Sequence, residues 1–289
     1  NTVLQAAINP YATYLGPIDT AARRISIMGI CNIIAWPASP MFLAWLIGKN
    51  LDEMVLSDIV FPFYVLTGIF VLLGLLVWVS PLKEMAFGEQ EEEGGDASEA
   101  EGKTSIFQFP HLILGALALF MYVGVETIAM ASSVDYAAEL KLPNPEQYAF
   151  IPSIGMILGY IFGIIMIPKF LSQSGALRVH SWIAIAGTLA VVLLPEQYSI
   201  YAVAVVTFGC SVMYPAIFPL AVKGLGKFAD KGSSILVGCI AGGSIVPLAY
   251  GFLKDWVGGQ AAYWIGIPCF AFIMFYAYIG YKMKGKTRK

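Results

Sequence analysis

Glu126 is the residue whose type and place in the chain point most directly to chemistry. It follows the apolar run Leu112–Val125, and of the eleven acidic residues outside the segment 81–108 it alone falls well inside such a run. In a lipid bilayer an ionised carboxylate costs about 2.5–3.5 kcal/mol on insertion scales. Tyr122 lies one turn earlier and Thr127 beside it, so one interpretation is a polar stripe that faces a cavity. The other is a carboxylic acid hydrogen-bonded to a neighbouring helix. No Lys or Arg lies at matching depth, so the carboxyl is either protonated or solvated.

Two pairs of residues share the spacing of one helical turn. Gln5 and Asn9 are four residues apart, as are Asn32 and Trp36, and residues at this spacing lie on one helix face. Amides both donate and accept hydrogen bonds, and beside an aromatic ring they suit the alternating hydroxyls and apolar faces of a sugar. Buried amides also join membrane helices to one another. The spacing alone therefore leaves sugar binding and helix packing both open.

Catalytic constellations are absent from the sequence. It has no His-Glu-x-x-His motif and no pair of aspartates inside an apolar run, and its two histidines, His111 and His180, lie at the edges of such runs. The four cysteines lie far apart within apolar runs, without the spacing of a zinc site or the density of a disulfide framework: Cys31, Cys210, Cys239 and Cys269. We therefore expect no catalytic residue, no metal site and no cofactor, and an intramembrane enzyme is disfavoured.

The composition is that of a membrane protein. Of the 289 residues, 58% are hydrophobic and 12% are charged, and the mean hydropathy is +0.74. Soluble domains carry about a quarter of their residues as charged side chains. A net charge of −2 provides no basic surface that could displace counterions from nucleic acid, which excludes a nucleic-acid-binding protein. The high apolar content excludes a disordered chain.

Apolar runs predict the membrane-spanning helices. A bilayer core of roughly 30 Å is crossed by about 20 apolar residues, and the sequence has eight such runs, near 25–47, 59–79, 109–130, 149–168, 179–195, 199–222, 233–253 and 261–282. A further apolar piece, 1–16, is too short to span and lacks the basic start of a signal peptide. We interpret it as the second half of a helix and expect the chain to be a fragment. Gly155, Gly159 and Gly163 recur every four residues and predict a face for close helix packing.

Basic residues predict the orientation, because short cytoplasmic loops collect Lys and Arg. They fall in alternate gaps between the runs, with 14 of the 17 on one side and only Lys49, Lys141 and Lys254 on the other. This pattern places the C-terminus in the cytoplasm, together with an acidic segment that has the composition of a linker. We predict that residues 1–80 end one helix bundle, that 81–108 form the linker and that 109–289 form a six-helix bundle.

Several strings of sequence carry a family resemblance. They are LQAAINPYATYLGP (4–17), RISIMGICN (24–32), YVGVE (122–126) and MYPAIFPLAVKGLG (213–226), followed by KGSS (231–234). These strings resemble the fucose–proton symporter family of the major facilitator superfamily, which includes bacterial glucose/galactose transporters. The resemblance runs through the whole chain in order. It implies an all-α membrane fold of twelve helices in two six-helix bundles, of which this chain holds about 8.5, from the fourth helix onward. It also implies a sugar bound between the bundles and exposed alternately to either side.

The resemblance also assigns roles to single residues. Gln5 matches a glutamate that takes part in proton coupling in the fucose symporter, and Asn32 matches an asparagine that contacts the sugar. Gly29 stands where the fucose symporter has a glutamine, so it and Gln5 favour the hexose-transporting branch. Glu126 fits the Tyr-Val-Gly-x-Glu pattern of that branch and becomes the visible candidate for carrying a coupling proton.

The resemblance therefore implies secondary active transport of a neutral hexose such as glucose or galactose, with fucose as the other candidate sugar and H⁺ or Na⁺ as the coupling ion. The expected substrate-binding residues are Gln5, Asn9, Asn32, Trp36 and Glu126. We expect a monomer in the bacterial inner membrane whose partners are a small sugar and the lipid bilayer, and not nucleic acid. The alternative is a truncated membrane product that does not transport, because alternating access needs two halves.

Overall fold

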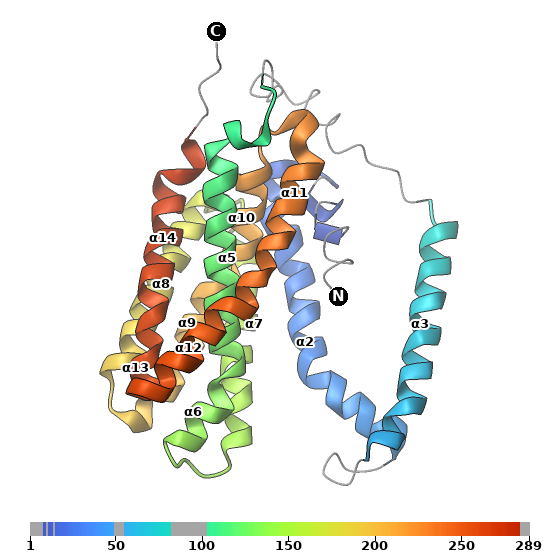
Figure 1. The fold of residues 1–289 in the computed structure, drawn as a ribbon. Helices are drawn as coiled ribbons and strands as arrows, with labels where there is room; N and C mark the ends of the chain where they lie inside the picture. The colour runs from blue at the N-terminus through green and yellow to red at the C-terminus, as the bar shows by residue number, and fades with distance from the viewer. Residues whose placement is uncertain (1–7, 10, 14, 49–54, 82–102, 284–289) are drawn as a thin grey trace. The chain divides into compact units, whose positions relative to one another are not determined.

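The structure is a computed structural model that describes residues 8–9, 11–13, 15–48, 55–81 and 103–283 (Figure 1). Within these residues every regular element is a helix. The chain divides into two compact units, one made of Asn1–Gly29 with Ala86–Lys289 and the other of Ile30–Met85. The predicted all-α fold is therefore observed. The predicted boundaries at 80 and 108 stay a prediction.

The first unit holds most of the helices. Helical residues at 8–9 and 11–13 and the 3-10 turn η1 (Ile18–Thr20) precede α2 (Ala21–Ile47), within which the boundary between the units falls. The helices that follow are α5 (Pro110–Ala131), α6 (Ser133–Glu139), α7 (Phe150–Met166), α8 (Gln173–Leu193), α9 (Glu196–Ser211), α10 (Met213–Val222), α11 (Ala229–Gly238), α12 (Gly242–Val257), α13 (Gly259–Ala262) and α14 (Gly266–Tyr278). Short 3-10 turns join several of them, including η6 (Pro145–Ala149), η8 (Cys239–Ala241) and η9 (Tyr263–Ile265). The second unit holds the rest of α2, the turn η3 (Leu56–Ile59) and α3 (Val60–Val79).

Seven helical stretches in the described part of the chain are long and apolar enough to cross a membrane. They are Val60–Val79, Pro110–Ala131, Gln147–Met166, Gln173–Leu193, Glu196–Val222, Gly226–Val257 and Gly259–Lys282. Each overlaps one of the runs predicted from hydropathy, and α2, with 27 residues, covers the remaining run at 25–47. Hydropathy thus located the spans, because a helix in lipid must be apolar along about 20 residues.

Three of these spans contain a break. The stretch Glu196–Val222 is interrupted at Val212, three residues before Pro215, and the stretch Gly226–Val257 at η8, directly before Gly242. The stretch Gly259–Lys282 is interrupted at η9, directly before Gly266. Proline has no N–H for the bond to the fourth residue before it, and glycine adds backbone freedom, so both favour a break. Breaks at membrane depth are tolerated where other protein groups or a watery cavity satisfy the freed backbone.

Small residues bring α7 and α9 close together, side by side in the first unit. A Cβ atom added to Gly155 would lie 2.1 Å from the Ala204 carbonyl oxygen, and one added to Gly159 would lie 2.2 Å from the Ser211 hydroxyl oxygen. Such separations are shorter than any non-bonded contact, so the two helices can approach only because these positions are glycine. The predicted glycine face is therefore confirmed as a packing surface.

Candidate functional site

Glu126 lies in the second half of α5, where it is half-buried. The hydroxyl of Tyr122, one turn earlier on the same helix, is close enough to interact with its carboxylate. The neighbouring Thr127 directs its hydroxyl to the backbone carbonyl of Val123, at 2.7 Å. A carboxylate and a phenol therefore lie together at membrane depth, as expected from the polar stripe. The hydroxyl of Thr127 is already hydrogen-bonded within its own helix.

Three other helices bring polar groups to this carboxylate. Tyr160 of α7, Cys210 of α9 and Tyr214 of α10 each interact electrostatically with Glu126. The rings of Tyr122 and Tyr214 lie with centroids 6.3 Å apart, and the Tyr214 ring stacks on Phe218 at 5.8 Å. Tyr122 is 1% and Tyr160 7% exposed, whereas Glu126 and Tyr214 keep partial exposure.

Asn9 joins this group from the beginning of the chain. Its side-chain amide donates a hydrogen bond to the Tyr214 hydroxyl, and its backbone carbonyl accepts one from the Thr13 hydroxyl at 2.8 Å. We call Asn9, Tyr122, Glu126, Tyr160 and Tyr214 the Glu126 cluster. It combines one carboxylate, one amide and three phenols from at least four helical segments. Two residues predicted to bind sugar, Asn9 and Glu126, are thereby brought together through Tyr214.

Arg24 holds the segment that contains Asn9 in place through hydrogen bonds to its backbone. Arg24 of α2 donates from Nε to the carbonyl of Ala12 at 2.8 Å, and from Nη2 to the carbonyl of Thr13 at 2.6 Å and that of Gly16 at 3.2 Å. Carbonyls at the end of a helical segment have no further turn to bond them, so a fork of guanidinium donors satisfies them. In addition, the Gln173 side-chain amide at the start of α8 donates to the carbonyl of Ile18.

The other predicted residues are not part of this cluster as described. Gln5 lies outside the described residues. Asn32 is an exposed residue of α2 in the second unit, and Trp36 belongs to the same helix, with its side chain outside what the structure describes. Their roles in binding sugar stay predictions.

Tyr160 and Tyr214 are the members that sequence reasoning missed as site residues. The chain has 15 tyrosines, many of them within the predicted spans, so a tyrosine in an apolar run is no distinguishing signal. The pairing of Asn9 with Tyr214 joins residues 205 positions apart, and no local pattern marks it.

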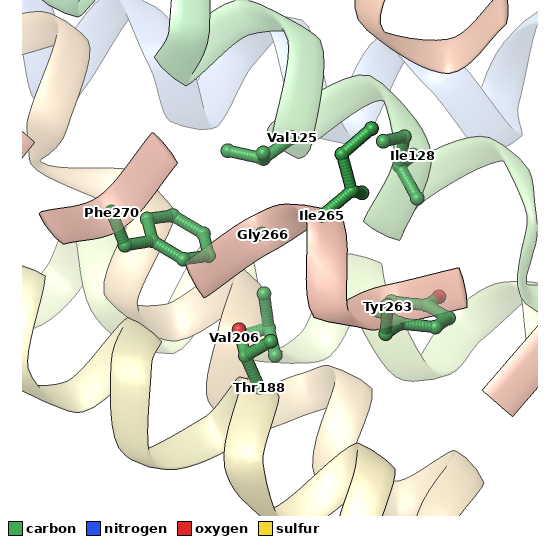
Figure 2. Close-up of a pocket in the computed structure, with 8 residues that line it drawn as sticks. All are labelled: Val125, Ile128, Thr188, Val206, Tyr263, Ile265, Gly266 and Phe270. Carbon is green, nitrogen blue, oxygen red and sulfur yellow. The ribbon is translucent and has the colours of Figure 1, made fainter. Parts of the chain in front are cut away.

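Two cavities of the first unit are lined by residues outside the Glu126 cluster. Figure 2 shows a pocket on another face of α5, where Val125, Ile128, Val206 and Phe270 surround a space of about 10 Å³. That volume holds about one water molecule. A larger, open groove of about 490 Å³ lies between α5, α6 and α12, and its lining includes Thr127, Ser132, Asp135, Tyr250, Lys254 and Asp255. No group of three or more His, Cys, Asp or Glu side chains that could hold a metal occurs in the part of the chain that was searched, namely the described residues.

Known proteins resemble the chain over nearly its whole length. No protein-family model matches it. The glucose/galactose transporter of Brucella abortus biovar 1 (strain 9-941) is 31% identical over 293 residues, which are 97% of this chain and 69% of that protein. The chain belongs to the fucose–proton symporter family of the major facilitator superfamily. A more distant member, the L-fucose-proton symporter of Escherichia coli (strain K12), is 26% identical over 302 residues, 95% of this chain and 68% of the symporter.

A solved member of the family has the same fold. The crystal structure of the major facilitator superfamily transporter FucP in the outward conformation matches with a TM-score of 0.77 and 25% identity, over 95% of this chain and 72% of FucP. The predicted superfamily fold, a sugar transporter of the membrane rather than an enzyme, is thereby confirmed. The relatives give no support to the alternative of a product that does not transport. The predicted orientation and the monomeric state stay predictions.

Proposed function

We propose that this protein is a cation-coupled transporter of a neutral hexose, glucose or galactose in the first place, and that the Glu126 cluster is part of the sugar site. The observation that supports this proposal is the meeting of a carboxylate, an amide and three phenols at membrane depth. Polar groups inside the bilayer are costly, and they persist where they serve a substrate or ion pathway.

The chemistry of the cluster suits a hexose. Each sugar hydroxyl both donates and accepts, and the cluster offers carboxylate oxygens that accept, an amide that does both and phenols that do both. The rings of Tyr122 and Tyr214 add apolar faces against which the C–H face of a pyranose can pack. Gln5, Asn32 and Trp36 are proposed to complete the site, as the family resemblance implies.

Glu126 is proposed as the coupling residue. An ionised carboxylate in a lipid environment is costly, and protonation removes that cost. A cycle in which Glu126 binds a proton before the sugar site becomes occluded, and releases it on the other side, links sugar movement to the proton gradient. A sodium ion would be attracted to the ionised carboxylate instead, so the two couplings respond oppositely to acid pH.

Uptake into liposomes tests the function. The purified protein is reconstituted, and entry of labelled D-glucose, D-galactose and L-fucose is followed with an inward H⁺ gradient, an inward Na⁺ gradient or neither. We expect glucose or galactose to accumulate above equilibrium with one of the two gradients and to exchange without either. If none of the three sugars enters under any gradient, the proposal is wrong.

Replacing Glu126 tests the coupling. Glu126→Gln keeps the shape of the side chain and one acceptor oxygen, resembling the protonated acid, but cannot exchange a proton. We expect the gradient to stop driving accumulation, while exchange of sugar between the two sides continues, with weaker affinity. The matched control is Glu196→Gln, which alters an exposed carboxylate in the first turn of α9. Uptake and pH dependence that are the same in Glu126→Gln as in the unaltered protein exclude Glu126 as the coupling site.

A further inference from the structure

Tyr160 lies unusually close to the backbone of α2. A Cβ atom added to Gly29 would come within 2.4 Å of Cζ of the Tyr160 ring, 2.7 Å of Cε1 and 2.8 Å of its hydroxyl oxygen. No real Cβ atom makes such contacts, so a side chain at position 29 would displace the ring. The hydroxyl end of Tyr160 is therefore placed where it is because residue 29 is glycine.

The same end of the ring lies near the charge of the cluster. The phenol of Tyr160 interacts electrostatically with Glu126 and with Tyr214, and the residue is 7% exposed. Gly29 thus leaves room for the Tyr160 ring in the position where its phenol interacts with Glu126.

The three phenols of the cluster differ in their partners. The hydroxyl of Tyr122 interacts with Glu126 on its own helix, and that of Tyr214 accepts a hydrogen bond from Asn9. The hydrogen bonds found among the described residues include none to the Tyr160 hydroxyl. The Tyr160 hydroxyl is not among the fully buried polar atoms that lack a partner, so it keeps some accessible surface. An accessible hydroxyl without a protein partner can bond a ligand or an ordered water. Among the phenols of the cluster, Tyr160 is therefore the one whose hydroxyl keeps both its donor and its acceptor capacity for a ligand.

We propose that the Tyr160 hydroxyl is a specificity-determining group that bonds one hydroxyl of the transported hexose, and that Gly29 is the residue that positions it. This inference rests on the proposed function. A phenol donates one hydrogen bond and accepts others, so it matches an equatorial or axial hydroxyl of a pyranose only when the ring is held at one place. A site built to bond a substrate hydroxyl discriminates against sugars that lack it, because its own polar group is then left unpaired.

Removing one hydroxyl oxygen at a time, from Tyr160 or from the sugar, tests this proposal. The KM for exchange is measured in liposomes for D-glucose, D-galactose and their mono-deoxy analogues, with the unaltered protein and with Tyr160→Phe. We expect Tyr160→Phe to raise the KM of the parent hexose about 5- to 10-fold. We also expect one deoxy analogue, the one that lacks the hydroxyl in question, to show the same KM in both proteins. The control is Tyr201→Phe, on an exposed ring of α9, which leaves all KM values unchanged.

A second substitution tests the role of Gly29. Gly29→Ala moves the Tyr160 ring, so it should raise the same KM values and spare the same deoxy analogue. In the Tyr160→Phe background it should change the KM less than 2-fold further, because the hydroxyl that it displaces is already gone. The matched control is Gly187→Ala, at another tight contact, where a Cβ would lie 2.8 Å from the backbone nitrogen of Val206. That variant should lower thermal stability without changing the order of sugar preference.

The outcomes separate this inference from the function on which it rests. If the unaltered protein exchanges no sugar, the proposed function is wrong, and this inference falls with it. If the unaltered protein exchanges hexose and Tyr160→Phe leaves every KM in the series unchanged, the inference is overturned while the function stands. A KM that rises equally for all deoxy analogues also overturns it, because it indicates a general loss of structure rather than one missing hydrogen bond.

Discussion

The hydrogen bond between Asn9 and Tyr214 is the residue-scale contact that ties the beginning of the chain to the Glu126 cluster. Asn9 is 7% exposed, so little water reaches it that could replace the phenol as a partner. Removing one partner therefore leaves the other without its bond.

A double-mutant cycle measures this contact. We expect Asn9→Ala and Tyr214→Phe to destabilise the protein in detergent each on its own, and the double variant to cost less than the sum of the two. Interhelical hydrogen bonds in membrane proteins contribute about 0.6 kcal/mol on average and up to about 1.7 kcal/mol. We predict a coupling energy within that range, from reversible chemical unfolding. Strictly additive effects would show that the two side chains do not interact.

At the residue scale, the sequence predicted some members of the cluster and not others. Glu126 was predicted because a single acid in a long apolar run is conspicuous, and Asn9 because an amide one turn from another amide marks a helix face. Tyr160 was not predicted, since its role depends on the absence of a side chain at Gly29, 131 positions earlier. A contact of that kind arises from tertiary packing and leaves no trace in local spacing.

At the scale of elements, the packing of α7 on α9 depends on glycine. A Cβ at Gly159 would meet the Ser211 hydroxyl oxygen at 2.2 Å and the Phe208 carbonyl oxygen at 2.7 Å. The backbone carbonyl cannot rotate away as a side chain can. The helices must therefore separate to admit even one methyl group.

Gly159→Ala tests this packing. Overpacking of a tight interface costs about 1–3 kcal/mol, and we expect a lower free energy of unfolding by that amount and a lower melting temperature in detergent. The control is Gly251→Ala in α12, where no atom lies within 4 Å of an added Cβ. There the substitution should be neutral or slightly stabilising, since alanine restricts the unfolded chain. Equal effects of the two substitutions would contradict the close approach of α7 and α9.

The spans themselves could be predicted, since a helix in lipid must be apolar along about 20 residues. The run at 199–222 was expected as one helix, and the structure divides it into α9 and α10 at Val212. Pro215 indicated a bend, but hydropathy does not show at which residue the backbone hydrogen bonds of the helix are interrupted.

At the scale of the whole molecule, the family resemblance predicts the fold and the distribution of basic residues predicts the orientation in the membrane. The resemblance in five short strings predicted the major facilitator superfamily fold, and the structural match to FucP over 95% of this chain confirms it. The alternation of basic loops predicts a cytoplasmic C-terminus. The site is harder to predict from sequence, because Asn9 and Tyr214 meet through a contact between residues 205 positions apart.

The proposed function requires that the hexose bind at the Glu126 cluster. A photoreactive diazirine derivative of D-glucose or D-galactose, cross-linked to the reconstituted protein and mapped by mass spectrometry, tests it most directly. We predict adducts within α5 near Tyr122 and Glu126, within α7 near Tyr160 and within α10 near Tyr214, all suppressed by excess unlabelled sugar. Adducts confined to the open groove along α12, or adducts that excess sugar does not suppress, would contradict the account.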